Sequence, residues 1–184
     1  MTSAIFGRGL PLTEDEFLAL GESSERIELF DGSLFVTPAP TPGHQFISRK
    51  LANALDRGAE SAGLFVSEAV NIRLRPGRIP IPDVVVTTMI NFSAPIIDAD
   101  AVLLVCEIVS PSNASADRVL KMHYYAAAGI PWYLLVEQDT GTLHLFQLVG
   151  DKYIERSVTG TDQTLHLIDP IEATLSPRDL LPPR

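Results

Sequence analysis

Two carboxylates occur in stretches of the sequence where few charges are expected. Asp83 lies near the start of residues 81–86, and Glu107 lies inside residues 102–109; both stretches are otherwise apolar. Short apolar runs rich in β-branched residues are typical of strands that are buried on both faces of a sheet. An unpaired carboxylate is strongly unfavourable in such a place. The chain must therefore supply a basic side chain or bind a cation there.

The two carboxylates together indicate a possible metal site. Adjacent strands would bring Asp83 and Glu107 close enough to share one hard divalent ion, which prefers oxygen ligands. With ligand distances near ~2.1 Å, the two carboxyl groups must then lie within about 8 Å of each other. Without the cation, such a cluster raises the pKa of at least one member. The alternative interpretation is that Asp83 caps a strand and that Glu107 pairs with an arginine or lysine.

The composition is typical of a globular protein. The 184 residues are 46% hydrophobic and 20% charged, which favours a single domain with a sizeable core, preceded by a loose tail over residues 1–10. The sequence contains neither a long apolar run nor a secretory signal, so we expect no membrane contact. The single cysteine, Cys106, is predicted to be a core thiol rather than a nucleophile. One unpaired cysteine fits the reducing cytosol, and we predict a cytoplasmic protein.

The formal net charge of −9 argues against a general nucleic-acid coat, which needs local positive charge. The distribution is uneven, because residues 1–43 are acidic whereas residues 44–78 are basic. The charged side chains of the basic segment are Arg49, Lys50, Arg57, Arg73, Arg75 and Arg78, against Asp56, Glu60 and Glu68. If a surface meets a polyanion, this segment builds most of it, and Arg73 and Arg75 are the candidate contacts. The alternative is a solvated helix face with a hairpin rim.

The first half of the chain predicts a short helix, a hairpin and a long helix. A capping-box pattern predicts a helix over about residues 13–20. Residues 27–30 and 34–36 alternate in polarity around an Asp-Gly turn, which is typical of a β-hairpin. Apolar residues at helical spacing predict the long helix over residues 44–62, which Gly63 ends.

The second half of the chain predicts a β-α-β unit followed by a meander. The Glu107 strand, a helix ending near residue 128 and a strand over residues 132–136 form this unit, whose two strands are parallel. Turn signals then predict antiparallel strands over residues 143–149 and 153–158. The result is a mixed sheet flanked by helices, in an α/β or α+β arrangement. Further expectations are one strand over 64–74, a polar loop over 91–100 and a short strand over 165–168.

Several stretches, in this order, resemble a known family. They are RIELFDG (26–32), PGHQ (42–45), PDVVV (82–86), CEIVSPS (106–112), and Asp117 through Lys121 to YAAAGIPWYLLV (125–136). An acid after a proline, a second acid on the next strand and a downstream lysine resemble the PD-(D/E)xK nucleases. The whole set is similar to the Uma-two family of endonucleases, long catalogued as a domain of unknown function. The resemblance covers roughly residues 12–150 and implies a restriction-endonuclease-like fold with an added hairpin and meander.

The resemblance implies a Mg²⁺-dependent endonuclease that cleaves phosphodiesters of nucleic acid, with DNA as the expected substrate and Mn²⁺ as an alternative ion. Asp83 and Glu107 would hold the ion, with the Ile108 carbonyl as a third ligand. The superfamily places its lysine two residues after the second acid, where this chain has Val109. Lys121 on the following helix is therefore the candidate to orient or deprotonate the attacking water and to stabilise negative charge.

Three further residues receive roles from the resemblance. Glu28 would complete the acidic cluster, unless it is a plain surface acid of the hairpin. His44 would contact phosphate or a metal-bound water, or would merely open the long helix, and Asp117 would orient Lys121 or form a surface ion pair. Two interpretations without catalysis stay open. One is a degenerate nuclease fold that binds DNA or protein, which the net charge favours, and the other is an obligate homodimer.

Overall fold

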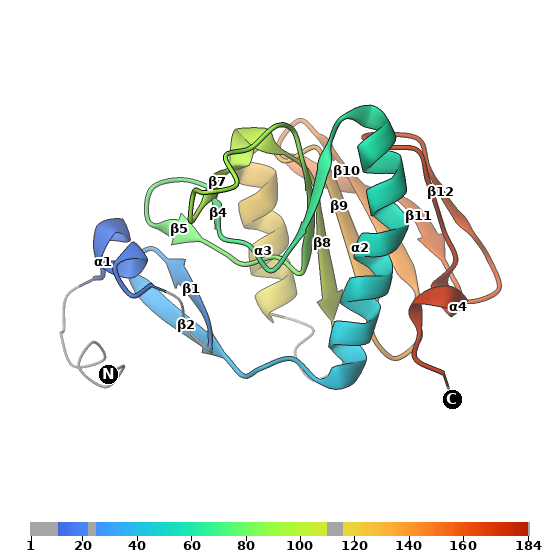
Figure 1. Ribbon diagram of the computed structural model, residues 1–184, viewed down its shortest axis with the longest axis horizontal. Helices are drawn as coiled ribbons and strands as arrows, with labels where there is room; N and C mark the ends of the chain where they lie inside the picture. Colours follow the sequence, from blue (N-terminus) through green and yellow to red (C-terminus); the bar gives the residue numbers. More distant parts are fainter. Residues whose placement is uncertain (1–10, 22–24, 110–115, 184) are drawn as a thin grey trace.

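The computed structural model describes residues 11–21, 25–109 and 116–183 (Figure 1). A six-stranded sheet forms the centre of this part of the chain. In spatial order its strands are β11 (Lys152–Thr159), β10 (Leu143–Val149), β9 (Trp132–Glu137), β8 (Val102–Val109), β6 (Val84–Thr87) and β3 (Phe65–Glu68). The pair β8–β9 is parallel and every other neighbouring pair is antiparallel. The predicted mixed sheet, its β-α-β unit and its meander are therefore confirmed.

The two long helices cover opposite faces of this sheet (Figure 1). They are α2 (Pro42–Ala62) and α3 (Ala116–Ala127). Successive strand residues point to opposite faces, so that Val84 packs in one cluster with Leu51 of α2. Its neighbour Val85 packs in the other cluster with Tyr125 of α3. Strands buried on both sides explain the continuous apolar runs in the sequence.

A smaller sheet lies beside the large one and carries the N-terminal hairpin. Its strands, in spatial order, are β2 (Ser33–Thr37), β1 (Arg26–Phe30) and β5 (Arg78–Ile79). Helix α1 (Glu14–Leu18) packs on this sheet. The predicted capping box is present, because Thr13 and Glu16 bond to each other's backbone. Phe17 and Leu29 belong to the small core of this region. The hairpin is held by residues distant in sequence, since β1 also pairs with β5.

Several irregular segments differ from the sequence-based expectation. Residues 64–74 do not form one strand, because Ala69 has φ of 51° and this left-handed conformation ends β3. The polar loop predicted over residues 91–100 contains a strand and a short 3-10 helix. The remaining short elements are β4 (Ile72–Arg73), which pairs with β7 (Ile97–Asp98), the 3-10 helix η2 (Ala99–Ala101), β12 (Leu165–Leu167), which pairs with β13 (Ala173–Leu175), and α4 (Pro177–Leu180). Of these, β12 confirms the short strand predicted over residues 165–168.

Cys106 is completely buried in β8. Burial and the nearby charges of Asp83 and Glu107 raise the pKa of its thiol well above the ordinary value. A protonated, enclosed thiol is a poor nucleophile, in agreement with the predicted core role. The tail predicted over residues 1–10 lies outside the described residues. Among the helices that are described, none has the length and apolar character needed to span a membrane.

Candidate active site

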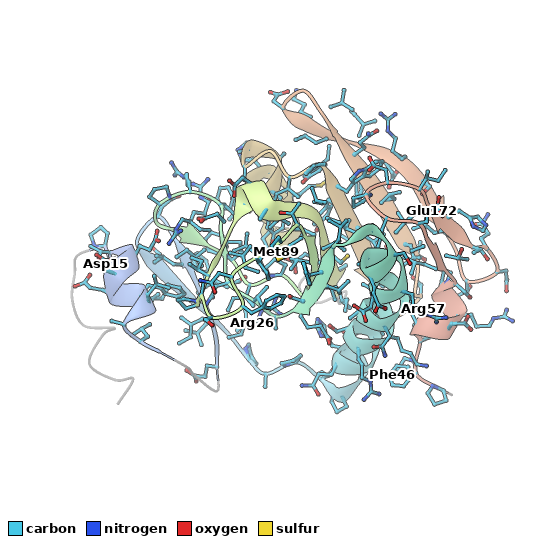
Figure 2. All side chains as sticks on the ribbon, turned by 45° about the horizontal axis from the view of Figure 1, so that its top comes forward. Asp15, Arg26, Phe46, Arg57, Met89 and Glu172 are labelled. Atoms are coloured by element: carbon cyan, nitrogen blue, oxygen red, sulfur yellow. The ribbon has the colours of Figure 1, made fainter. Side chains whose placement is uncertain are left out.

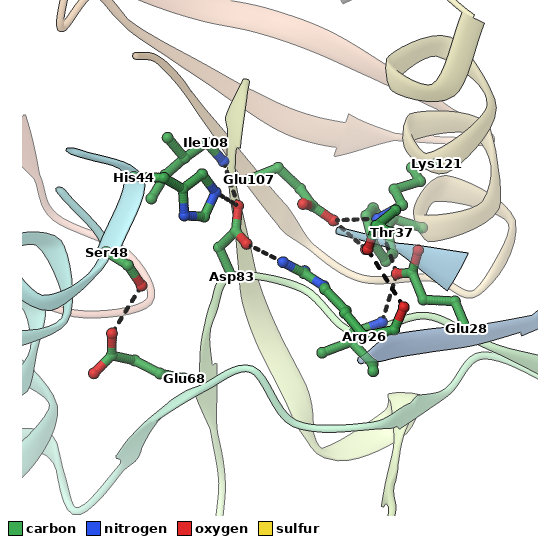
Figure 3. Close-up of polar contacts among 12 residues, drawn as sticks. Arg26, Glu28, Thr37, His44, Ser48, Glu68, Asp83, Glu107, Ile108 and Lys121 are labelled. Atoms are coloured by element: carbon green, nitrogen blue, oxygen red, sulfur yellow. Dashed lines mark hydrogen bonds and ion pairs between the residues drawn. The ribbon is translucent and has the colours of Figure 1, made fainter. Parts of the chain in front are cut away.

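Asp83 and Glu107 lie on neighbouring chain segments, as a shared metal ion requires. Val84 of β6 is opposite Cys106 of β8 in an antiparallel register, which brings the preceding Asp83 beside Glu107. Only 4% of Asp83 and 7% of Glu107 is exposed. The prediction that their strands are neighbours in one sheet is therefore confirmed. Both carboxyl groups face side chains contributed by β1 and by the two long helices (Figure 3).

Asp83 is held by contacts to both carboxylate oxygens. Its Oδ1 accepts a hydrogen bond from Nη1 of Arg26 at 2.6 Å, and its Oδ2 accepts one from the backbone N–H of Ile108 at 2.7 Å. Nε2 of His44 lies 3.2 Å from Oδ2. Burial alone would raise the pKa of Asp83, but the contact with His44 and the charge of Arg26 lower it to about 2. Asp83 is therefore ionised at neutral pH.

The pKa of Glu107 shifts in the opposite direction, although Glu107 lies beside Asp83. Burial, together with repulsion from Asp83 and Glu28, raises its pKa to about 7 against the attraction of Lys121 and Arg26. The expectation that at least one carboxyl of the cluster has a raised pKa is met, with burial as the larger cause.

The position of Glu107 is set from α3. The hydroxyl of Tyr125 donates to its Oε1 at 2.6 Å, and Nζ of Lys121 lies 3.5 Å from the same oxygen. Two residues one helical turn apart thus contact a single carboxylate oxygen.

Lys121 and Glu28 form a buried ion pair. Nζ of Lys121 donates to Oε1 of Glu28 at 2.9 Å, and the N–H of Ile81 donates to the same oxygen at 2.8 Å. Burial alone would lower the pKa of Lys121, but the charges of Glu107 and Glu28 raise it above its ordinary value. The ammonium group is therefore permanently charged. We call Arg26, Glu28, Asp83, Glu107 and Lys121 the buried cluster.

The local structure explains how His44 reaches this cluster. The long helix begins at Pro42, two positions before the predicted start, because Thr41 caps it and accepts a hydrogen bond from the N–H of His44. The first turn thus directs the imidazole toward Asp83 (Figure 3). Asp117 lies in the first turn of α3, but its side chain is outside the described residues.

Arg73 and Arg75 lie apart from the buried cluster, in ion pairs with other acids. Arg73 pairs with Glu14 of α1 and Asp98 of β7, and Arg75 pairs with Asp31 in the β1–β2 turn. Acids that are distant in sequence thus fold onto both arginines, and their contact with nucleic acid stays a prediction. These residues form, with Arg78, which also binds Asp31, what we call the outer network. Arg57, in contrast, is exposed on α2 (Figure 2).

Two residues of the site received no role from the sequence. Arg26 precedes Glu28 by two positions in β1, and such residues point to the same face of a strand. Tyr125 follows Lys121 by four positions on α3, which places both on one helix face. The spacing therefore indicates both residues, but only once the buried face of the strand and of the helix is known.

The carboxylates of the site fit a divalent ion only in part. Carboxylate oxygens suit Mg²⁺ chemically. In the described residues, however, no three His, Cys, Asp or Glu side chains are arranged as ligands of one ion. The oxygens of Asp83 are instead engaged by Arg26, His44 and Ile108. The groups therefore fit a metal by their chemistry, but an ion at Asp83 would have to share or displace the contact that Arg26 makes.

Comparisons with known proteins agree with this fold. The Uma2 family, described as "Putative restriction endonuclease", matches residues 14–180. A crystal structure described as a "putative nuclease belonging to DUF820" from Anabaena variabilis superposes with a TM-score of 0.71 at 20% sequence identity. The match covers 92% of this chain and 97% of that chain. At this identity the likeness shows a shared fold. No curated protein matches the sequence.

Proposed function

Because the chain belongs to the Uma2 family, we propose that it is a nuclease that hydrolyses phosphodiester bonds of nucleic acid with a divalent metal ion. The observation that carries this proposal is the meeting of Asp83, Glu107 and Lys121, which are only 4%, 7% and 8% exposed. Buried charges with shifted pKa values gather at functional sites more often than elsewhere. DNA is the proposed substrate and Mg²⁺ the proposed ion, with Mn²⁺ as a substitute.

Asp83 and Glu107 would hold the ion. The Ile108 carbonyl is a candidate third ligand, because the N–H of the same strand residue already reaches Asp83 and both groups point to one edge of β8. When bound, the ion supplies Lewis-acid activation of the phosphate and of a water molecule. The chain's own contacts orient the ligands, since His44 contacts Asp83 and Tyr125 donates to Glu107.

Lys121 would act as a fixed positive charge. Its contacts with Glu28 and Glu107 hold the ammonium group beside the proposed ion site. Positive charge in a site with little water stabilises the negative charge that develops on a phosphate during hydrolysis. Because its pKa is raised, Lys121 suits charge stabilisation better than removal of a proton from water. Lys121 would thus perform the role of the superfamily lysine from helix α3 instead of strand β8.

The proposal is tested by divalent-dependent cleavage of plasmid, linear duplex, single-stranded DNA and RNA. Asp83→Asn and Glu107→Gln should each remove nearly all cleavage, because each deletes a ligand charge with little change of shape. Lys121→Ala should slow cleavage by about a hundredfold or more. Asp162→Asn, which removes a carboxylate that is 83% exposed, should cleave like the wild type. Activity that persists in both ligand variants would be a contaminant and would overturn the assignment.

A second candidate function is a nuclease-fold protein without catalysis, which binds DNA or protein as a homodimer. It is favoured by the ion pairs Arg26–Asp83 and Lys121–Glu28, which neutralise the carboxylates without a metal. It predicts no cleavage of any substrate and no difference between wild type and Asp83→Asn. Sedimentation velocity would test the homodimer separately, as a mass twice that of the chain.

A further inference from the structure

Arg26 lies among the carboxylates of the buried cluster (Figure 3). Its side chain is 19% exposed, and Nη1 is 2.6 Å from Oδ1 of Asp83. Burial alone would lower its pKa, but the charges of Asp83, Glu107 and Glu28 raise it. One guanidinium group thus interacts with three carboxylates that come from β1, β8 and the residue before β6.

Arg26 and a divalent ion would compete for the same carboxylate. Oδ2 of Asp83 already accepts from Ile108 and lies near His44, and Oδ1 accepts from Arg26. An ion that binds Asp83 must therefore displace the guanidinium or share a carboxylate with it at close range, where like charges repel. An arginine does not lose its proton in proteins, but its side chain is long and flexible. Arg26 would consequently move rather than become neutral.

The second terminal nitrogen of Arg26 indicates where the group would go. Nη2 is buried and has no hydrogen-bond partner among the described residues. A guanidinium presents parallel N–H donors that match two oxygens of one phosphate. The formal charges also agree. A divalent ion and one phosphodiester, added to the three carboxylates and two cations of the buried cluster, make the site neutral.

We propose that Arg26 is a mobile counter-ion of the candidate site, which neutralises Asp83 in the metal-free protein, leaves when a divalent ion binds, and then binds the substrate phosphate. The inference rests on the proposed function and extends it by assigning the phosphate-binding group. It assigns two successive partners to one side chain. Its signature is therefore a pair of opposite effects, on metal affinity and on cleavage.

The first experiment measures Mn²⁺ affinity by calorimetric titration of the full-length protein. Arg26→Gln should bind Mn²⁺ at least about tenfold more tightly than the wild type, because the competing cation is gone. Arg156→Gln is the matched control, since it removes the same charge from an exposed position in β11, and it should bind like the wild type. Arg26→Lys keeps the charge and should stay close to the wild type, which provides a conservative variant if Arg26→Gln does not fold.

The second experiment follows cleavage by the same variants at saturating Mn²⁺. Arg26→Gln should cleave about a hundredfold more slowly in spite of its tighter metal binding, because the phosphate loses its guanidinium. Arg26→Lys should recover part of this loss. A merely structural role of Arg26 would instead weaken metal binding and cleavage together.

The third experiment needs no substitution in the protein that is measured. In ¹⁵N-arginine-labelled wild type, the guanidinium signal that is missing from Arg26→Lys is assigned to Arg26. Saturating Mg²⁺ should move this signal toward that of an exposed arginine. A signal that does not respond to saturating Mg²⁺ would overturn the inference while leaving the proposed function intact, as would equal Mn²⁺ affinity of Arg26→Gln and wild type. Absence of Mn²⁺ binding in every variant would overturn both.

Discussion

The buried cluster and the outer network are built from the same kinds of charged groups, but their surroundings differ. Side chains of the buried cluster are 3–19% exposed, whereas those of the outer network range from 11% for Arg78 to 60% for Asp98. In the cluster, burial raises the pKa of Glu107 to about 7 while His44 and Arg26 lower that of Asp83 to about 2. In the outer network, the contacts with Arg78 and Arg75 lower the pKa of Asp31. The comparison shows that the pKa values of two acids that are both removed from water are set by the individual partners of each acid.

Removal of one cation from each region should reveal the difference between the two regions most clearly. Lys121→Met leaves Glu28 and Glu107 buried without their ammonium group and should lower the free energy of unfolding by about 3–5 kcal/mol. Arg75→Met removes an exposed partner of Asp31 and should lower it by at most about 1 kcal/mol. Urea unfolding of the two variants measures both values. Equal losses would mean that the ion pairs of the cluster are no stronger than surface pairs.

The pH dependence of stability should come from the buried cluster. Between pH 4.5 and about 7, folded Glu107 keeps a proton that the unfolded chain has lost, so stability should fall as the pH rises through this range. The fall is at most about 3–4 kcal/mol, since one pKa unit is worth about 1.4 kcal/mol. Asp83 acts in the opposite sense, because its stabilisation is lost as the pH falls from 3.8 toward 2.

This dependence is measured by urea unfolding in EDTA between pH 4 and 8. In Glu107→Gln the fall should disappear, because the amide does not titrate. Asp31→Asn serves as the control from the outer network and should keep the fall of the wild type above pH 4.5. A slope that survives in Glu107→Gln would assign the titration to another group.

Metal binding should also distinguish the buried cluster from the outer network, with a somewhat smaller effect on stability. Mn²⁺ at about a hundred times its dissociation constant should stabilise the native state by about 2.7 kcal/mol, which is several degrees in melting temperature for a chain of this size. Asp83→Asn should lose this shift, and Asp31→Asn should keep it. Differential scanning fluorimetry with and without millimolar Mn²⁺ gives the answer. An unchanged wild-type melting curve would contradict the proposed ion site.

The smallest effect is expected in the outer network. Arg73→Ala or Arg75→Ala should weaken binding to a labelled DNA duplex only modestly and reduce the slope of its salt dependence by at most about one, the value for one phosphate contact. Pairing with Glu14, Asp98 and Asp31 already engages these guanidinium groups. Anisotropy titrations over a series of salt concentrations measure the slope. A larger change would show that the pairs open on nucleic acid.

Much of the fold could be predicted because long segments carry strong local signals. The apolar runs around Val85 and Val105 predicted buried strands, and the crossover through α3 predicted the parallel pair β8–β9. Elements of two residues, such as β4 and β7, have too little periodicity to be recognised. Ala69 gave no signal for its left-handed conformation, since alanine rarely adopts it.

The candidate site could be predicted only as far as single residues show unusual surroundings. Asp83 and Glu107 are conspicuous because each interrupts an apolar run. Arg26 has no such signal, and its partner Asp83 is 57 positions away in the sequence. The same limit explains Arg73 and Arg75, whose neutralising acids lie on other elements. The roles of the predicted catalytic and metal-binding residues stay predictions until the variants are measured.

The contact between Glu28 and Lys121 also has a consequence for the order of folding. It joins two residues that are 93 positions apart, and closing so long a loop is entropically unfavourable until other contacts have formed. On the ribosome, β1 and β8 are synthesised before the ammonium group that neutralises their two glutamates. A nascent chain that ends in β8 would have to bury both acids without Lys121. We therefore expect the hairpin and β8 to be buried together stably only after α3 has been synthesised and has packed against them.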